Sequence, residues 1–369
     1  MLKLFEVDNF RGFDAPTSID FQAGSYAFNE AVVKSGVVKN AIIYGRNGVG
    51  KSALGIALFD IVSHLTDKKT IGRPYLNPYC NLTTNRESAR FRYVFAFDGN
   101  EVEYEYAKTD LTELSWEKLF VNGERLIDFN FQSGGERYIK PDLVGSLNIE
   151  LEDNKLSIIK YIYRNTPTDT VPIIRKLVEF CNGMLWYRSL SDGNDYAGFL
   201  TGSDNIDERI YARGKVKEFE QFLKENGLDY TLGFVERDGK HVMTVDFGGG
   251  RSAAFDAVAS TGTKTLSLFF YWKITAFEKL SLLFIDEFDA FLHFESAASI
   301  VRILNTTTTC QTILTSHNTS LMNNELTRPD CCYVMTRNKV TPLCRATNRI
   351  LREGHNLSKL YVNGAFAES

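Results

Sequence analysis

The clearest indication of the fold is the stretch Asn40-Ala41-Ile42-Ile43-Tyr44-Gly45-Arg46-Asn47-Gly48-Val49-Gly50-Lys51-Ser52. It begins with a short, mostly apolar run suited to a buried strand and continues as G-x-x-x-x-G-K-S without a departure. Glycines let successive backbone N–H groups turn inward around a β-phosphate, the lysine supplies charge to the β- and γ-phosphates, and the serine hydroxyl suits Mg²⁺. Residues 53–65 then predict a helix whose positive N-terminus faces the phosphates. The stretch therefore predicts a nucleotide-binding loop formed by Gly45, Arg46, Asn47, Gly48, Val49, Gly50, Lys51 and Ser52, with Ser52 also at the metal.

An apolar run that ends in two carboxylates predicts the second half of this site. Residues 281–285 are typical of a buried strand, and Asp286 and Glu287 follow directly. A P-loop enzyme needs this arrangement opposite its phosphate loop, with Asp286 holding Mg²⁺ through water and Glu287 acting as general base on the attacking water. The alternative is a strand followed by a solvated acidic turn, which the accompanying phosphate loop disfavours.

Two further segments are candidates for contact with a γ-phosphate. Ser260 and Gly262 stand at the start of an expected helix, so they form a second candidate phosphate-binding helix start; a plain serine N-cap is the alternative. His317 ends the apolar run that begins at Gln311, and a histidine at a strand end is usually structural. Because His317 lies 31 residues after Asp286, one further strand and helix would bring it beside the same γ-phosphate.

The order of these motifs resembles the ABC-type ATPase heads of the SMC and RecF class. The resemblance covers about the first 110 and the last 120 residues, and it rests on residues 7–13, 45–52, Ser260-x-Gly262, 285–287 with Asp289 and His293, and His317. Within that class the chain looks most like the small ATPases of abortive-infection and phage-defence operons, of which the ATPase subunits of Septu and PARIS systems are relatives. This closer likeness rests on residues 260–264, 286–293, 315–318 and 355–366.

The resemblance implies an α/β fold, a P-loop NTPase of the ABC/SMC head type with an antiparallel β subdomain and an inserted α+β or helical region. It also implies that Arg11 touches phosphate, that Ser260 and Gly262 contact the γ-phosphate bound to a second subunit, and that His317 senses this phosphate. ATP and Mg²⁺ are then the expected cofactors, and a homodimer or higher homo-oligomer that sandwiches ATP is the expected assembly. Residues 260–264 lack the second glycine and the glutamine of a transporter signature, and no glutamine stands out as a Q-loop residue.

Composition narrows the class of protein. The chain has 369 residues, 44% hydrophobic and 24% charged, which excludes disorder and collagen. A formal net charge of −4 gives no global attraction to nucleic acid or to an anionic membrane, so such contacts would need a local patch. The six cysteines show no C-x-x-C spacing, and the longest apolar stretch, residues 266–277, is interrupted by Lys273. We expect a cytoplasmic chain with reduced thiols that neither spans nor binds a membrane.

Turn signals organise the rest of the chain. Hairpins are predicted around Asp98-Gly99, Asn122-Gly123 and Asp238-Gly239, and helices over residues 156–163, 172–180 and 207–226. We therefore predict three segments. They are an N-terminal part of the head with a β hairpin (1–110), an inserted α+β or helical region (111–250), and a C-terminal part of the head with the signature, carboxylates and switch histidine (251–369).

Three classes of function remain. The favoured hypothesis is an enzyme that hydrolyses ATP to ADP and phosphate and acts as a sensor or regulator of a separate effector, a nuclease, in bacterial antiphage defence. The alternative is a RecF-like DNA-binding ATP clamp in repair, for which Arg86, Arg90 and Arg92 are the best basic cluster unless they only face solvent. A transporter ATPase is third. The region 111–250 is the candidate docking surface for the effector, and a lid over the nucleotide is its alternative role.

Overall fold

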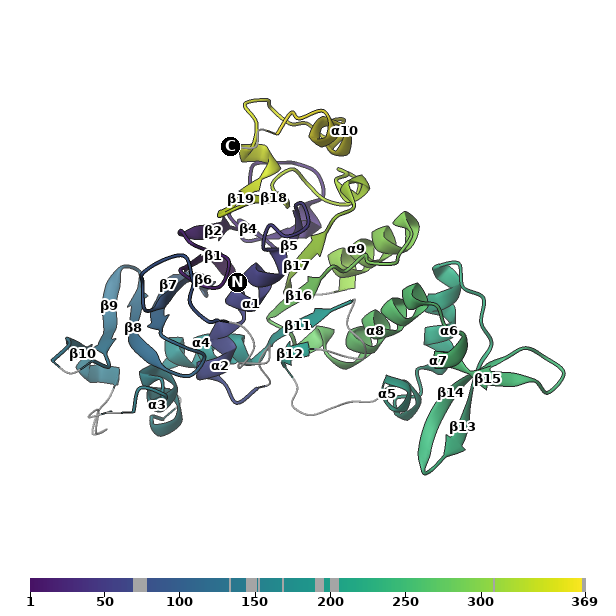
Figure 1. Cartoon of the computed structure of the whole chain (residues 1–369), viewed down its shortest axis with the longest axis horizontal. Coiled ribbons are helices and arrows are strands. Elements are labelled where there is room, and N and C mark those ends of the chain that lie inside the picture. The colour runs from purple at the N-terminus through teal and green to yellow at the C-terminus, as the bar shows by residue number, and fades with distance from the viewer. Residues whose placement is uncertain are drawn as a thin grey trace.

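The computed structural model describes residues 1–68, 78–132, 134–143, 151, 153–167, 169–189, 196–199, 206–307 and 309–366. Its middle is a seven-stranded sheet (Figure 1). Five parallel strands lie in the order β11 (Met184–Arg188), β16 (Leu282–Asp286), β17 (Gln311–Ser316), β5 (Asn40–Tyr44) and β18 (Cys332–Thr336). The antiparallel edge strands are β12 (Tyr196–Gly198) and β19 (Lys339–Pro342).

The three strands that carry the sequence motifs are confirmed. Every residue of β5, β16 and β17 is buried, as expected of parallel strands covered on both faces. All three end at the same edge of the sheet, because parallel strands share their carboxyl edge. The phosphate loop, Asp286 with Glu287, and His317 therefore lie at neighbouring strand ends.

Helices cover the two faces of this sheet and divide its apolar side chains between two cores. On one face lie α1 (Lys51–Leu58), α2 (Asp60–Leu65), α3 (Ile158–Asn165) and α4 (Pro172–Asn182). On the other lie α8 (Thr261–Thr275), α9 (Phe294–Thr307) and α10 (Leu357–Val362). The helix predicted over residues 53–65 is present as α1 and α2, with a break at Phe59.

A second seven-stranded sheet, wholly antiparallel, packs its apolar face on the first of these cores. Its order is β10 (Arg137–Ile139), β9 (Glu124–Asn130), β8 (Leu114–Val121), β7 (Asn100–Lys108), β6 (Ala89–Phe97), β1 (Leu2–Asp8) and β2 (Thr17–Asp20). The hairpins predicted at Asp98-Gly99 and Asn122-Gly123 are confirmed, and these four turn residues have φ values of 48°, 83°, 51° and 81°. A two-stranded ribbon, β3 (Val33–Lys34) and β4 (Val37–Val38), completes this part.

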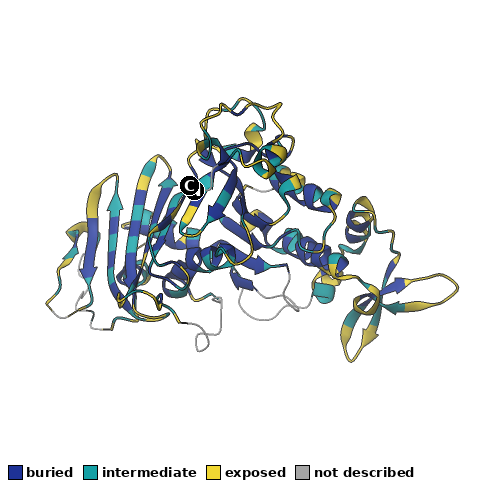
Figure 2. Cartoon of the chain, turned by 45° about the horizontal axis from the view of Figure 1, so that its top comes forward, coloured by how far each residue is buried: buried dark blue, intermediate teal, exposed yellow. Residues whose placement is uncertain are grey.

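A small lobe follows, formed by α5 (Ile206–Ala212), α6 (Val216–Glu225), β13 (Leu232–Arg237), β14 (Lys240–Asp246), β15 (Ser252–Ala254) and α7 (Phe255–Val258). The hairpin at Asp238-Gly239 is confirmed, and Figure 2 shows much of this lobe exposed, while the central strands are buried. The single helix expected over residues 207–226 is two helices, because Gly214 has a φ of 64° and interrupts the first.

Residues 111–250, expected as one inserted region, contribute to three places. β8, β9 and β10 extend the antiparallel sheet, β11 joins the central sheet beside β16, and residues 206–250 build the small lobe. The physical reason is that backbone N–H and C=O groups need partners. A strand satisfies these groups by pairing with the edge strand of an existing sheet. The proposed limits at 110 and 250 stay a prediction as domain boundaries.

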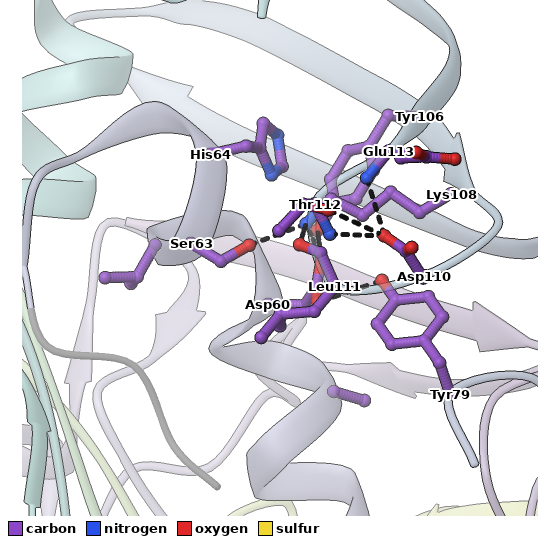
Figure 3. Close-up of polar contacts among 12 residues, drawn as sticks. Asp60, Ser63, His64, Tyr79, Tyr106, Lys108, Asp110, Leu111, Thr112 and Glu113 are labelled. Carbon is purple, nitrogen blue, oxygen red and sulfur yellow. Dashed lines mark hydrogen bonds and ion pairs between the residues drawn. The ribbon is translucent and has the colours of Figure 1, made fainter. Parts of the chain in front are cut away.

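A buried polar network joins α2 to the antiparallel sheet (Figure 3). Lys108 Nζ lies 2.8 Å from Asp60 Oδ1 and donates to Ser63 Oγ at 2.6 Å and to the carbonyl oxygen of Leu111 at 3.2 Å. The hydroxyls of Tyr106 and Tyr79 donate to the two oxygens of Asp60 at 3.0 and 2.9 Å. Helix α2 is therefore fixed to the sheet by a buried ion pair in which both side chains are hydrogen-bonded.

No helix in the described parts of the chain combines the length and apolar character needed to cross a membrane.

Candidate functional site

The phosphate loop has the backbone that its glycines predict. A Cβ atom on Gly45 would lie 2.7 Å from the carbonyl oxygen of Met335 and 3.0 Å from Val49 Cγ2, so only glycine fits at the strand end. Gly48 and Gly50 have φ values of 81° and 108°, a region that side chains disfavour. Helix α1 begins directly after Gly50, so its free N–H groups point into the loop. This loop can enclose an anion.

Lys51 lies at the first position of α1 and turns back over the loop. Its Nζ donates to the carbonyl oxygens of Gly45 at 2.8 Å and Arg46 at 3.2 Å and lies 3.0 Å from His317 Nε2. Burial lowers the pKa of Lys51, while the acidic side chains after β16 act to raise it. The structure therefore brings together Lys51 and the switch histidine, as the sequence spacing predicted.

Thr315 holds the two carboxylate residues in place. Its hydroxyl accepts from the backbone N–H of Glu287 at 2.7 Å and donates to Asp286 Oδ1 at 2.7 Å. Asp286 is wholly buried, and Glu287 has a φ of 52° that turns the chain sharply at the strand end. Asp286 Oδ2 and Glu287 Oε2 are buried without any hydrogen-bond partner.

Arg188, at the end of β11, is a site residue that the sequence analysis missed. It stands directly opposite Asp286 in the pairing of β11 with β16. Its Nε lies 3.5 Å from Asp286 Oδ2, and its Nη2 lies 3.2 Å from Glu287 Oε2. The apolar run at 184–187 that ends in an arginine resembles the other central strands and was the available signal.

Asp289 and His317 lie at the rim of the same site. The Ser316 hydroxyl donates to Asp289 Oδ2 at 2.7 Å, and burial raises the pKa of this carboxyl. His317 is exposed, so its ring is open to a ligand above Lys51.

Ser260 and Gly262, the signature residues of the resemblance, lie at the start of α8. Ser260 caps α8 by accepting from the Thr263 N–H at 3.2 Å, which is the plain structural role considered above. A Cβ on Gly262 would lie 2.6 Å from the carbonyl oxygen of Phe291, so glycine allows the turn after β16 to pass close by. Ser260 is exposed, and α8 packs on the opposite face of the central sheet from α1. The phosphate contact expected of Ser260 and Gly262 remains a prediction.

Arg11 has the left-handed backbone, with a φ of 49°, and its N–H donates to the Tyr79 carbonyl oxygen at 3.0 Å. Burial lowers the pKa of its guanidinium, and the nearby Asp60 and Tyr79 oppose this shift. Its Nε is buried without a hydrogen-bond partner. In this opening motif Phe13 faces the phosphate loop, since its ring would lie 3.7 Å from a Cβ on Gly50. The phosphate contact of Arg11 also remains a prediction.

These groups fit a magnesium nucleotide. The loop offers inward N–H groups and Lys51, while Asp286 and Glu287 each keep one buried oxygen atom without a hydrogen bond. Carboxylate, hydroxyl and water oxygens are the ligands that Mg²⁺ prefers, usually with only one or two carboxylates. Within the described residues no cluster of three or more His, Cys, Asp or Glu side chains could hold a metal ion.

Solved structures and one family model are similar to the chain. No curated protein matches the chain. Among solved structures, the chain is similar to the SMC head domain from Thermotoga maritima, with 17% identity over 92% of this chain and 97% of that one, at a TM-score of 0.43. It is also similar to the Smc head domain bound to the C-terminal domain of ScpA derived from Pyrococcus furiosus, with 12% identity over 92% and 95% and a TM-score of 0.38. The family described as "AAA domain, putative AbiEii toxin, Type IV TA system" matches residues 41–323, which is most of the chain. The chain belongs to this family, and its α/β fold is that of a P-loop NTPase.

Proposed function

We propose that this protein binds ATP with Mg²⁺ and hydrolyses it to ADP and phosphate. The observation that carries the proposal is the meeting of Lys51, His317, Asp286 and Glu287 at the carboxyl edge of β5, β16 and β17. Bound Mg²⁺ would neutralise charge on the phosphates. Ser52 and Asp286 would hold it, Lys51 would hold the β- and γ-phosphates, and Glu287 would take a proton from the attacking water. His317, exposed beside Lys51, would contact the γ-phosphate.

The second part of the proposal is an ATP-dependent dimer. Ser260 and Thr261 are exposed at the start of α8, and α1 packs on the other face of the same sheet. A second copy that presents Ser260 and Gly262 to the γ-phosphate would close the site, and hydrolysis would release it. Two equivalent sites would form in one symmetric dimer.

The third part concerns output. The family description names a toxin–antitoxin system, and abortive infection is the setting that the motifs resemble. We infer that the ATP-driven dimer senses or regulates a separate effector, a nuclease, in antiphage defence. The alternative of a DNA clamp gains no support from the arginine cluster: Arg86 pairs with Asp8, Arg90 with Glu105, and Arg92 with Glu103 at 2.6 Å. Their charge is largely neutralised.

Nucleotide titration tests the first part. Lys51→Ala should abolish ATP binding while leaving the fold intact, whereas Lys34→Ala, an exposed lysine on β3, should bind ATP normally. Unchanged affinity in Lys51→Ala would refute the phosphate-loop assignment.

Mixing tests the dimer. Ser260→Arg should bind ATP but not hydrolyse it, and Lys51→Ala should do neither. A mixed dimer has one site lacking both elements and one intact site, so mixing should restore up to about half of the activity per dimer. Proven mixed dimers without any activity would show either strict coupling of the two sites or a signature that acts within its own chain.

A further inference from the structure

Asp286 ends β16 and Glu287 follows it directly, and their side chains are only 0% and 20% exposed. Thr315 satisfies only Asp286 Oδ1, and Asp286 is 0% exposed. Lys51 lies beyond ion-pair distance and is turned toward Gly45, Arg46 and His317. Within the described parts of the chain, Arg188 is the only cationic side chain within 4.0 Å of either carboxylate. A buried charge needs such a partner, because its desolvation is otherwise costly.

The contact is close but incomplete. Arg188 Nε, Asp286 Oδ2 and Glu287 Oε2 all lack a hydrogen bond, although the groups face each other at 3.2–3.5 Å. Arginine and carboxylate usually form two parallel hydrogen bonds where a pair serves structure alone. The Arg188 side chain is 38% exposed, so it has space to turn outward. Its backbone is held, since the N–H of the next residue, Ser189, donates to the Asp286 carbonyl oxygen at 3.2 Å.

We propose that Arg188 is a built-in counter-ion that occupies the metal position beside Asp286 and leaves it when a divalent cation arrives. A Mg²⁺ ion about 2.0–2.1 Å from Asp286 Oδ2 would bring its positive charge close to the Arg188 guanidinium, and this repulsion would displace the arginine side chain. The exchange therefore couples metal loading to a movement of the Arg188 side chain. This inference rests on the proposed function, because it takes Asp286 as a metal residue.

Metal binding to the purified full chain tests the exchange. Mn²⁺ serves as the probe, measured by the loss of its free paramagnetic resonance signal, first alone and then with ADP. Arg188→Gln should bind Mn²⁺ about tenfold more tightly than the wild type, a screened Coulomb effect for a half-exposed cation near the carboxylates. Arg188→Lys keeps the charge but loses the two-point contact, so its affinity should lie between the two. Arg237→Gln removes the same charge from the exposed end of β13 and should leave the affinity unchanged.

The outcomes distinguish failure of the Arg188 exchange from failure of the metal site at Asp286. If the wild type binds no Mn²⁺ even with ADP, the metal site itself fails. If the wild type binds Mn²⁺ and Asp286→Asn does not, but Arg188→Gln binds equally or less tightly, the counter-ion exchange is wrong while the metal site stands. Thermal unfolding confirms that each variant is folded. Should Arg188→Gln not fold, Arg188→Lys decides, since an affinity no tighter than that of the wild type contradicts the exchange.

Discussion

Two ion pairs in this molecule, Asp60 with Lys108 and Asp286 with Arg188, differ in how many of their polar atoms have hydrogen-bond partners. Asp60 and Lys108 are 3% and 0% exposed, and every hydrogen-bonding position of the lysine and both aspartate oxygens have partners (Figure 3). Asp286 is equally buried, yet one of its oxygens accepts no hydrogen bond, and its partner Arg188 is 38% exposed.

The difference separates a structural pair from a site held open for a ligand. Leaving a buried polar atom unsatisfied costs about 1–3 kcal/mol, so a folded chain tolerates it where something else offsets the cost. Both oxygens of Asp60 already accept hydrogen bonds, whereas Asp286 Oδ2 and Glu287 Oε2 accept none. Completeness of hydrogen bonding thus distinguishes two carboxylates that burial alone would rank together.

The largest effect should come from breaking the complete pair. Lys108→Met leaves Asp60 as an uncompensated buried charge and should lower the free energy of unfolding by about 3–5 kcal/mol. Lys118→Met is the matched control, because its pair with Asp128 is partly exposed and should cost less than about 1 kcal/mol. Urea unfolding of both variants measures the difference, and equal losses would mean that the buried network carries no special stability.

At the site of Asp286 and Glu287 we expect a substitution to change the rate of ATP hydrolysis and not the stability. Glu287→Gln should lower ATP hydrolysis about a hundredfold or more, the scale of losing a general base. ATP should stay bound and the dimer should persist longer. The control Glu295→Gln changes an exposed residue in the first turn of α9. Hydrolysis is followed by phosphate release, and normal turnover in Glu287→Gln would require another base.

Lys108 also lowers the pKa of the buried His64, so the network around Asp60 should make stability depend on pH. Burial and then Lys108 hold the pKa of His64 well below 6.5. The unfolded chain takes up a proton near pH 6.5 and the folded chain does not, so stability falls as the pH drops below 6.5. The loss is at most about 1.4 kcal/mol per pH unit. His64→Gln, which can still bond to Tyr104, should remove this loss.

The measurement is the difference in unfolding free energy between wild type and His64→Gln from pH 7 to pH 5. Glu117 acts in the opposite sense, because burial raises its pKa above 4.5 and the folded chain gains a proton first as the pH falls. It is present in both proteins and cancels in the difference. A difference that does not change with pH would contradict the assignment to His64.

The smallest effect should come from exposed pairs in the small lobe. Lys217 pairs with Glu220, and Lys224 lies 3.9 Å from Asp229, with the lysines 81% and 64% exposed. Changing both lysines to Glu should alter stability by less than about 1 kcal/mol and leave ATP hydrolysis intact. If α6, which lies within residues 111–250, is part of the docking surface for the effector, the variant should no longer co-purify from its host with the effector, which we expect a neighbouring gene to encode. Retention of that partner would place the docking surface elsewhere.

The parts of the candidate site that lie within one continuous motif could be predicted from the local sequence. The strands before Gly45, Asp286 and His317 and the loop itself required only apolar runs with polar ends. Thr315 and Arg188 escaped prediction because their roles arise from sheet register, which pairs residues far apart in the chain. The Asp60–Lys108 pair escaped for the same reason, since neither residue has a local signal for burial. The sheets that β8 to β11 join could not be predicted, because hairpin signals locate turns and not the sheet to which a strand adds.

The order of the central strands has a consequence for synthesis of the chain on the ribosome. β5, which leads into the phosphate loop, is paired only with β17 and β18, and more than 260 residues separate it from either. At ~5–20 residues per second, the nascent loop waits roughly 13–50 s for its neighbours. During this interval the apolar strand has neither partner, so chaperones have time to bind it. The sheet around the phosphate loop is therefore complete only after translation has passed β18.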